Sequence, residues 1–193
     1  ISRDVTTRRA AEASLARRER QQEAVAELGL LALRTADLDA LLRRATAILS
    51  GRLEVQFSTA VEIQPDGSTL LRAGVGWPDG LVGEYRCGSD VSTLTGFTLR
   101  GRGPTVVDDY GTETRFTPPQ LSETFQVRSG VTVVIGRDDA PYGVLGVHSL
   151  IPRRFTPDDV SFVQAVAHVL TEAISRQGAE RSLAEHARSL AQL

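Results

Sequence analysis

Two side chains in this sequence could do chemistry on their own, those of His148 and Cys87. An imidazole can hold a haem iron or hydrogen-bond to a ligand, and a cysteine thiolate can be oxidised. Cys87 follows Arg86, whose positive charge would favour the thiolate. The competing interpretation is a hydrogen-bonded structural histidine and an inert thiol. A single histidine without partners does not make a metal site.

No larger catalytic pattern surrounds these two residues. The sequence has no G-x-S-x-G nucleophile elbow, and Gly101 and Gly103 are not followed by the Lys-Ser or Lys-Thr of a phosphate-binding loop. With one cysteine in 193 residues, an internal disulfide and a metal site of several cysteines are both excluded. We therefore expect no catalytic residue, no metal and no cofactor, and we predict that the chain is not an enzyme.

The overall composition limits the classes of partner and the cellular locations that we expect for this chain. Acidic and basic residues are interspersed and give a formal net charge of -2, so we expect no nucleic-acid partner. No apolar run approaches membrane-spanning length, and the first residues lack a signal-peptide pattern. We expect a cytoplasmic protein without direct membrane insertion. Because the sequence lacks an initiator methionine, we also expect it to be a piece of a longer protein.

The clearest structural elements lie near the end of the sequence. Tyr142–Leu150 is β-branched and apolar and follows turn residues at 138–141, which predicts a strand. Thr156 is a candidate N-cap with Pro157 at the first helical position, so a long helix is predicted from there to about Arg176. Its apolar residues recur every three or four positions, so one face should lie on a core.

Periodicity and turn residues predict the other elements in the same way. The predicted helices are Asp4–Leu33, Leu38–Leu53, 92–100 and Gln120–Gln126, and the predicted strands are Phe57–Ile63, Ser68–Val75, Thr105–Val107 and Val131–Ile135. Residues 81–88 show no clear period and are predicted to be a connection. This order of elements predicts an α+β fold, in which an antiparallel sheet carries the terminal helices on one face.

Two stretches of the chain resemble a GAF domain. They are Gly96–Phe116 and Val127–Ile174, and the likeness extends over about residues 20–176. The most characteristic part is a glycine-bearing strand followed by Phe155-Thr156-Pro157-Asp158-Asp159 and the last helix. The resemblance implies a central antiparallel sheet with long N- and C-terminal helices on one face. On the other face, short helices and loops would form a small-molecule pocket.

The resemblance also implies where ligand-binding residues would lie. The pocket walls would come from Ser92–Arg100, Asp108–Phe116 and Gln120–Phe125, with one further residue on the neighbouring strand. The candidates are Phe97, Phe116 and Phe125 as apolar lining, and Asp108, Asp109, Tyr110, Arg115 and His148 as polar groups. The competing interpretation is that the phenylalanines are plain core residues and the charged residues are solvated loop residues.

The cyclic-nucleotide-binding branch of the family does not match well. Its members carry Asn and Lys, then Phe, then Asp-Glu. Phe155 and Asp159 keep that spacing here, but Val160 replaces the Glu, and His148 and Ser149 stand where Asn and Lys would lie. We therefore do not expect cyclic-nucleotide binding.

Two further branches depend on cysteine. Bilin-binding members attach their chromophore through a cysteine just before the strand Val131–Ile135, and Gln120–Val127 contains none. Cys87 lies too early in the chain for that role. Members that reduce free methionine sulfoxide need several cysteines, since one thiolate attacks and a second thiol resolves the disulfide. One cysteine cannot complete that cycle.

The terminal helices indicate how the chain is connected to other domains. Asp4–Glu12 is similar to the segment that ends many PAS domains and opens a signalling helix. In the last helix one heptad register holds a seam of apolar residues that is broken by Arg176 and Glu180, which favours pairing with a second copy through weak, polar steps. The seam consists of Phe162, Val166, Val169, Ala173, Leu183, Ala187 and Leu190. The alternative is a single helix that frays after about Gln177.

These observations together predict three parts. Residues 1–34 would be a signalling helix after an upstream PAS-like domain, 35–176 a GAF domain, and 177–193 a linker helix toward an output domain. The predicted function is a sensory module, homodimeric through its terminal helices, that binds an unknown small molecule or relays a signal. The output would be a histidine kinase, a phosphatase or a cyclic-dinucleotide enzyme. The alternative is a ligand-free spacer that only holds the dimer geometry.

Overall fold

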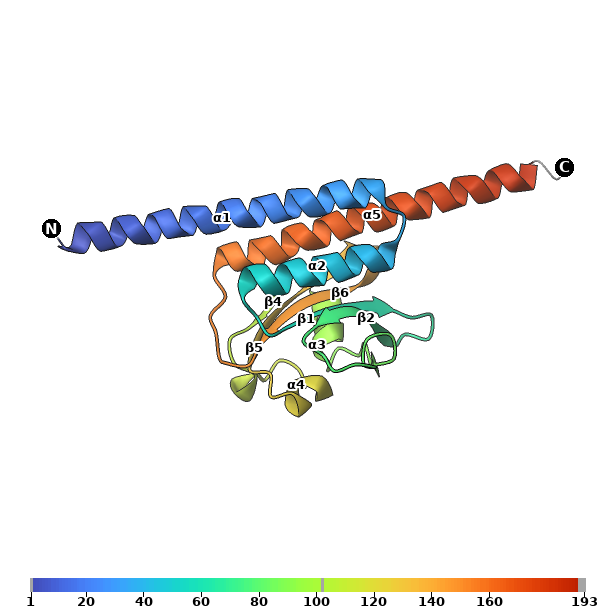
Figure 1. The fold of residues 1–193 in the computed structure, drawn as a ribbon. Coiled ribbons are helices and arrows are strands. Elements are labelled where there is room, and N and C mark those ends of the chain that lie inside the picture. The colour runs from blue at the N-terminus through green and yellow to red at the C-terminus, as the bar shows by residue number, and fades with distance from the viewer. Residues whose placement is uncertain (1, 102, 191–193) are drawn as a thin grey trace.

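The computed structural model describes residues 2–101 and 103–190 as a six-stranded antiparallel sheet with helices on both faces (Figure 1). The spatial strand order is β3-β2-β1-β6-β5-β4. The strands are β1 (Phe57–Ile63), β2 (Thr69–Val75), β3 (Arg86–Cys87), β4 (Thr105–Val107), β5 (Ser129–Arg137) and β6 (Ala140–Ser149). The helices are α1 (Ser2–Arg34), α2 (Leu38–Leu53), α3 (Leu94–Arg100), the 3-10 turn η1 (Tyr110–Thr112), α4 (Gln120–Thr124) and α5 (Pro157–Leu190). The predicted α+β fold class is confirmed.

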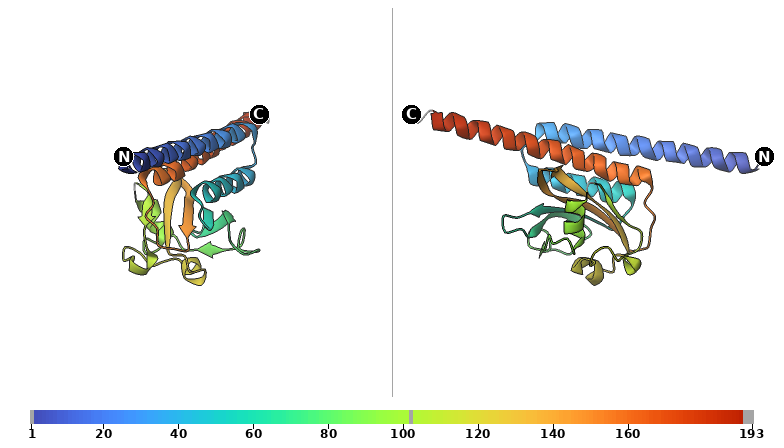
Figure 2. Two further views of the ribbon diagram at one scale, coloured as in Figure 1. Left: turned by 60° about the vertical axis from the view of Figure 1, so that its left-hand side comes forward. Right: turned by 180° about the vertical axis from the view of Figure 1, so that it is seen from behind.

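The three long helices form two layers on one face of the sheet. Helices α2 and α5 pack on the strands, and α1 lies over α2 and α5 (Figures 1 and 2). Because side chains alternate along a strand, every second residue of β5 and β6 points toward these helices. The resulting helix-side core includes Val131, Val133, Ile135, Leu145 and Val147 of the sheet, with Val163, Val166 and Leu170 of α5. The long terminal helices therefore rest on one face, as predicted.

Helices α1 and α5 run parallel to each other. Arg17 of α1 bonds to Asp159 of α5, and further along both helices Arg176 donates to the carbonyl oxygen of Ala32. Beyond this overlap the first half of α1 projects from one end of the domain and the last part of α5 projects from the other (Figure 1). The two helices thus project from opposite sides of the domain along parallel, neighbouring axes (Figure 1).

The start of α5 confirms the predicted cap. The backbone N–H of Asp159 donates to the hydroxyl of Thr156 at 3.2 Å, and the backbone N–H of Thr156 donates back to the Asp159 carboxylate at 3.1 Å. This reciprocal pair satisfies donors that the first turn of a helix leaves free. Pro157 follows as the first helical residue, where its missing N–H costs nothing.

The last helix, α5, is continuous to Leu190 and does not end near Gln177, where the alternative interpretation had it fray. Phe162, Val166 and Ala173, which were predicted to line a seam between copies, are buried in the helix-side core of their own chain. Among the leucines of that register, Leu183 and Leu190 stay exposed. Within residues 2–101 and 103–190, no helix combines the length and apolarity needed to cross a membrane.

A second, smaller apolar cluster lies on the opposite face of the sheet. It joins β1 and β4 to α3, η1 and the loops around α4. Its members, called the loop-side core below, are Phe57, Leu94, Val107, Tyr110, Phe116 and Val127, with Trp77, Phe97 and Phe125 partly buried against them. Two-residue strand β3, in the segment predicted to be a connection, extends the sheet at its edge by pairing with Thr69 and Leu70 of β2.

Candidate functional site

The strands offer short or polar side chains to the loop-side core. Thr59 of β1, Gly146 of β6 and Thr132 of β5 meet there, since a Cβ added at Gly146 would lie within 3.1 Å of side-chain atoms of Thr59, Thr132 and His148. Gly130 of β5 pairs with His148 of β6 across the sheet. Alternation along the strands puts these residues on the face opposite to α2 and α5. This face therefore combines polar strand residues with aromatic residues from the loops.

His148 is buried at this face. Its Nε2 lies 3.2 Å from the hydroxyl oxygen of Thr59, whereas its Nδ1 has no hydrogen-bond partner among the residues that the structure describes. Burial lowers the pKa of His148 to about 4, because removing the imidazolium from water is costly. At neutral pH the ring is uncharged. The hydrogen bond to Thr59 agrees with the structural-histidine interpretation, but the second ring nitrogen stays available.

Tyr110 approaches the same place from η1. Its ring belongs to the loop-side core, and its hydroxyl oxygen is buried with no partner among the described residues. Burial also raises the pKa of this hydroxyl, so it stays protonated at neutral pH. A Cβ added at Gly130 would lie 2.8 Å from Nδ1 of His148 and 3.4 Å from Oη of Tyr110. The same Cβ would lie 2.7 Å from the carbonyl oxygen of Val147, so only glycine fits between these atoms.

Three aromatic rings lie beside His148. Phe57 and Trp77 are stacked with ring centroids 4.4 Å apart, and Phe125 meets the edge of Trp77 at 5.6 Å. The Trp77 ring lies at 6.3 Å from His148 in an edge-on arrangement, and its Nε1 donates to the carbonyl oxygen of Ser58 at 2.8 Å. Aromatic surfaces of this kind can pack a flat apolar molecule or simply fill the core.

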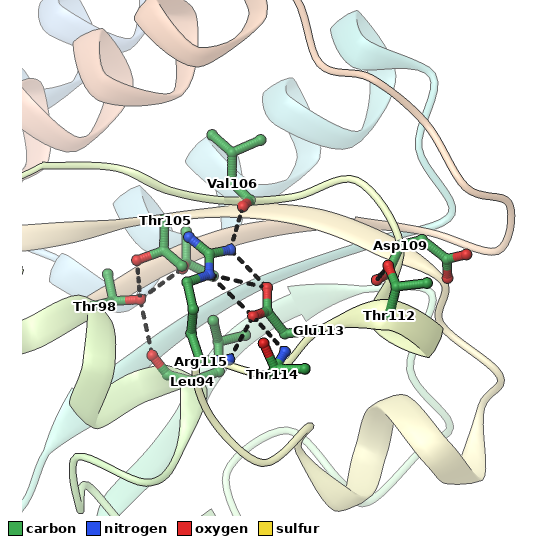
Figure 3. A network of polar contacts seen from close by, with 10 residues as sticks. Leu94, Thr98, Thr105, Val106, Asp109, Thr112, Glu113, Thr114 and Arg115 are labelled. Carbon is green, nitrogen blue, oxygen red and sulfur yellow. Dashed lines mark hydrogen bonds and ion pairs between the residues drawn. The ribbon is translucent and has the colours of Figure 1, made fainter.

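Arg115 stabilises the outer wall of this region. Its guanidinium lies 5.5 Å and 5.7 Å from the ring centroids of Phe97 and Phe116. It also pairs with Glu113 and donates to the carbonyl oxygen of Val106 at 2.7 Å (Figure 3). The Arg115 hydrogen bonds lower the pKa of Glu113. Every strong partner of this arginine belongs to its own chain. Arg115 therefore holds this wall in place and is not a free cation for a ligand.

Hydroxyl groups connect α3 to the sheet beside that wall. The Thr98 hydroxyl lies 2.9 Å from the carbonyl oxygen of Leu94, 3.0 Å from the hydroxyl of Thr105 and 2.7 Å from that of Thr132 (Figure 3). Thr98 is fully buried, so these bonds replace the water that its hydroxyl loses on folding. The network fixes the position of α3, which carries Phe97.

Asp108 and Asp109 do not join the aromatic region. The Asp109 carboxylate accepts a hydrogen bond from the backbone N–H of Gly111 at 2.9 Å. Its two oxygens also accept hydrogen bonds from Nη2 of Arg128, at 2.9 and 3.0 Å. The Gly111 hydrogen bond and then Arg128 lower the pKa of Asp109. Asp108 is exposed, and its carboxylate lies 3.8 Å from Arg154. Both carboxylates are therefore turn and surface residues, as the competing interpretation held.

A groove of about 600 Å³ opens next to Tyr110. It runs between η1, α4 and the ends of β5 and β6, and its walls include Tyr110, Ser122, Gln126, Val127, Arg128 and Leu150. Gln126 has a positive φ of 55°, an uncommon conformation for a residue other than glycine. The groove gives solvent access to the Tyr110 side of the loop-side core.

Sequence reasoning missed several residues of this region. Phe57 and Trp77 carry the central aromatic stack, Glu113 holds Arg115, and Gly130 makes room for His148. Trp77 is the sole tryptophan of the sequence and follows glycine-rich residues, a signal that could have drawn attention to it. The contact between Phe57 and Trp77 depends on how β1 and the loop after β2 meet in space. No sequence spacing encodes that contact.

No group of three His, Cys, Asp or Glu side chains that could hold a metal occurs in the described part of the chain. Cys87 is partly buried on β3, with its Sγ 2.9 Å from the hydroxyl of Thr69.

A second groove lies on the helix side, between α1 and α5. It measures about 560 Å³ and has an apolar floor with a charged rim. Its walls include Gln22, Val25 and Ala26 of α1 and Ser161, Phe162 and Ala165 of α5, with Arg18 and Asp158 at the rim. Arg18 and Asp158 are paired at 2.7 Å. Apolar grooves between long helices are typical positions for another helix.

Comparisons with known proteins agree with this architecture. A family model for the GAF domain matches residues 37–174. The GAF domain from a phosphoenolpyruvate-protein phosphotransferase of Coxiella burnetii has a TM-score of 0.72 at 16% identity, covering 86% of this chain and 98% of that chain. None of the curated protein sequences matches this chain.

Two other solved structures are similar in fold. A phycocyanobilin-bound GAF domain from a cyanobacterial phytochrome has a TM-score of 0.69 at 18% identity, covering 83% of this chain and 96% of that chain. Free methionine-R-sulfoxide reductase from Neisseria meningitidis, solved with its substrate, has a TM-score of 0.70 at 16% identity, covering 83% of this chain and 91% of that chain. At such identities the likeness shows the fold alone.

Proposed function

This chain belongs to the GAF domain family, and on that premise we propose that it is a sensory module working as a homodimer. It binds a small molecule on the loop side of the sheet and relays the change through α1 and α5. An upstream PAS-like domain and a downstream histidine kinase, phosphatase or cyclic-dinucleotide enzyme complete the proposed protein. The module acts by binding and not by catalysis, and its single cysteine suits a reducing cytoplasm.

The observation that carries this proposal is the parallel packing of α1 and α5, which leave the domain at opposite ends (Figure 1). A helix that enters from one side and a helix that leaves on the other can connect two further domains. Both rest on a sheet whose opposite face holds His148, Tyr110 and the aromatic residues. A ligand that favours one arrangement of that face shifts the population of helix arrangements by its difference in affinity.

The homodimer is supported by apolar surface outside the domain. Leu183 and Leu190, seven residues apart on the projecting part of α5, are 71% and 72% exposed. Leu33, near the end of α1, is also 72% exposed. A short solitary helix is marginal in water, so these segments gain stability when a second copy covers them. The occupant that we propose for the helix groove is therefore a second copy of this chain.

A thermal melting screen tests the sensory function. Ligand binding to the native state raises the unfolding midpoint, so at least one member of a panel of nucleotides, haem and metabolites should raise it. Trp77, the single tryptophan, should report the same ligand by a fluorescence change, because it lies beside His148. The closely packed loop-side core favours a second candidate function, the ligand-free dimerisation spacer. A flat response across the whole panel would support that spacer.

A further inference from the structure

We infer that Arg153, in the connection between β6 and α5, couples the position of the incoming helix α1 to the loops on the opposite face of the sheet. This inference rests on the proposed function, because it names the residue through which a signal would pass between the helices and the loop-side core. Arg153 is a positioning residue, since it acts through the elements that it holds. These are the end of α2, the start of α5 and the segment before η1.

Arg153 is held by its backbone and by its side chain. Its backbone N–H donates to the carbonyl oxygen of Asp108 at 3.1 Å, shortly before η1. Its Nη1 donates to the carbonyl oxygen of Leu53, the last residue of α2, at 2.7 Å, and its Nη2 lies 3.5 Å from the Asp159 carboxylate. The guanidinium also lies 4.9 Å from the ring centroid of Phe155. Because the side chain is only 23% exposed, these contacts replace water that it loses on folding.

The carboxylate of Asp159 extends this connection to α1. One of its oxygens accepts a hydrogen bond from Arg17, and the other accepts one from the backbone N–H of Thr156 and faces Arg153. The Asp159 side chain is 2% exposed, and a buried carboxylate needs a cation beside it. Among the described residues, Arg17 and Arg153 are the two cations within 4 Å of this carboxylate. A residue of α1 and a residue of the connection therefore share it.

This sharing allows two arrangements of the connection. When α1 is in place, Arg17 compensates the charge of Asp159, and Arg153 bonds to the end of α2. When α1 moves away, Arg153 is the remaining cation, so the buried carboxylate draws its guanidinium away from Leu53. That turn shifts the backbone of the connection and, with it, the hydrogen bond to Asp108. A displacement of α1 thus changes the populations of the two arrangements.

On the loop side, hydrogen bonds carry this movement from Asp108 to the loop-side core. The neighbouring Asp109 pairs with Arg128, and the backbone N–H of Tyr110 donates to the carbonyl oxygen of Arg128 at 2.7 Å. The backbone N–H of Arg128 in turn donates to the carbonyl oxygen of Ser149 at 2.8 Å, at the end of β6. The segment before η1 therefore positions Tyr110, whose ring belongs to the loop-side core.

Amide hydrogen exchange of the full chain, resolved by NMR, tests the coupling. Arg17→Met keeps the stem of the side chain but removes its charge. Exchange at the backbone amides of Tyr110 and Arg153 should become about threefold to tenfold faster, the value of one net hydrogen bond. Rates are taken relative to the amides of the β1–β6 ladder, since a loss of global stability accelerates both sets. Arg18→Met, next in the same helix and paired with the more exposed Asp158, is the matched control and should leave this ratio unchanged.

Removing the guanidinium of Arg153 tests the route itself. In a double-mutant cycle, adding Arg17→Met to Arg153→Met should no longer change the exchange ratio at Tyr110, because the charge that responds to Asp159 is gone. Circular dichroism confirms folding. If this double variant does not fold, Arg17→Met is combined with Asp159→Asn instead, which leaves no buried carboxylate unpaired. Compared with Asp159→Asn alone, that combination should likewise show no change in the ratio.

Either of two results would overturn the inference. An equal ratio in Arg17→Met and in the unaltered chain would show that the position of α1 does not reach the loop side. A response to Arg17→Met that persists without the Arg153 guanidinium, or with Asp159→Asn, would show that another route carries it. The melting screen decides the sensory function separately. If no ligand raises the midpoint while the ratio responds, the small-molecule sensor is wrong and the coupling stands; if a ligand binds and the ratio does not respond, the reverse holds.

Discussion

Arg17 of α1 donates a hydrogen bond of 2.9 Å to the carboxylate of Asp159 at the start of α5, although the two residues are 142 positions apart. The Asp159 side chain is only 2% exposed. It also accepts the backbone N–H of Thr156 and lies 3.5 Å from Arg153, whose own backbone N–H donates to the carbonyl oxygen of Asp108. One buried carboxylate thus joins the N-terminal helix, the C-terminal helix and the loop that leads to η1.

Replacing this carboxylate should weaken the junction strongly. Asp159→Asn removes the negative charge that faces Arg17 and Arg153, and breaking a buried pair leaves the remaining charges poorly compensated. We expect the free energy of unfolding to fall by about 2–4 kcal/mol. Urea unfolding followed by circular dichroism measures this loss.

The neighbouring aspartate provides the matched control. Asp158 pairs with Arg18 on the same two helices, but both side chains are considerably more exposed. Surface pairs contribute little, so Asp158→Asn should cost less than about 1 kcal/mol. Equal losses in the two variants would show that burial of Asp159 is not what gives the junction its strength.

His148 should make the stability depend on pH. Burial lowers its pKa from 6.5 to about 4 in the folded chain, so between these values the unfolded chain binds more protons. Its contribution is complete above pH 6.5 and is lost as the pH falls toward 4, with a slope of up to about 1.4 kcal/mol per pH unit. The stabilisation from Asp109 and Glu113, whose pKa values are lowered from 3.8 and 4.5, is present throughout this window and is lost only as the pH falls below those values. Urea unfolding at several pH values between about 5 and 7 measures the slope.

The histidine variants separate this effect from others. His148→Phe should flatten the slope in that window, because no buried imidazole remains to be kept neutral. His168→Phe alters an exposed histidine of α5 and should leave the slope as it is. Identical slopes for the unaltered chain and His148→Phe would contradict the assignment.

A methyl group at residue 130 should disturb the loop-side face. A Cβ there would lie 2.7 Å from the carbonyl oxygen of Val147 and 2.8 Å from Nδ1 of His148. Gly130→Ala is therefore expected to cost about 1–3 kcal/mol in unfolding free energy. Gly51→Ala, in α2 and with no described heavy atom within 4 Å of the new methyl, should instead stabilise by about 0.5–1 kcal/mol. A tolerated Gly130→Ala would refute the close packing around His148.

The exposed leucines of α5 should hold two copies together. Changing both Leu183 and Leu190 to Glu places like charges in the proposed seam, so the mass measured by light scattering should fall toward that of one chain. Val82→Glu, at an exposed apolar residue of the loop between β2 and β3, is the control and should leave the mass unchanged. An unchanged mass in the double variant would exclude this seam.

The parts of the structure that were predicted from sequence are those with local signals. Thr156, Pro157 and Asp159 encode the start of α5 within four residues, and the structure confirms the cap. Runs of β-branched and apolar residues beside turn residues likewise predicted the strands of the β5–β6 hairpin, although β5 is longer at both ends and β6 begins two residues earlier and ends one residue earlier than expected. Such features depend on neighbours in the chain and not on the fold around them.

The candidate site was only partly predictable, because its contacts join distant segments. Tyr110, Phe116 and His148 were expected at the pocket and do lie at the loop-side face. The charged candidates Asp109 and Arg115 are instead bound by Arg128 and Glu113, partners that residue types alone do not specify. Whether a charge is free or neutralised is decided by the fold.

The parallel overlap of α1 and α5 determines how a force on one helix reaches the other. The helix that enters and the helix that leaves point the same way but lie on neighbouring axes, about 8–10 Å apart as packed helices are. Pulling or twisting α1 therefore acts on α5 as a sliding movement along the contact between the two helices. That sliding is opposed by the polar contacts of Arg17 with Asp159 and of Arg176 with Ala32, and by the apolar residues of both helices that are buried between them.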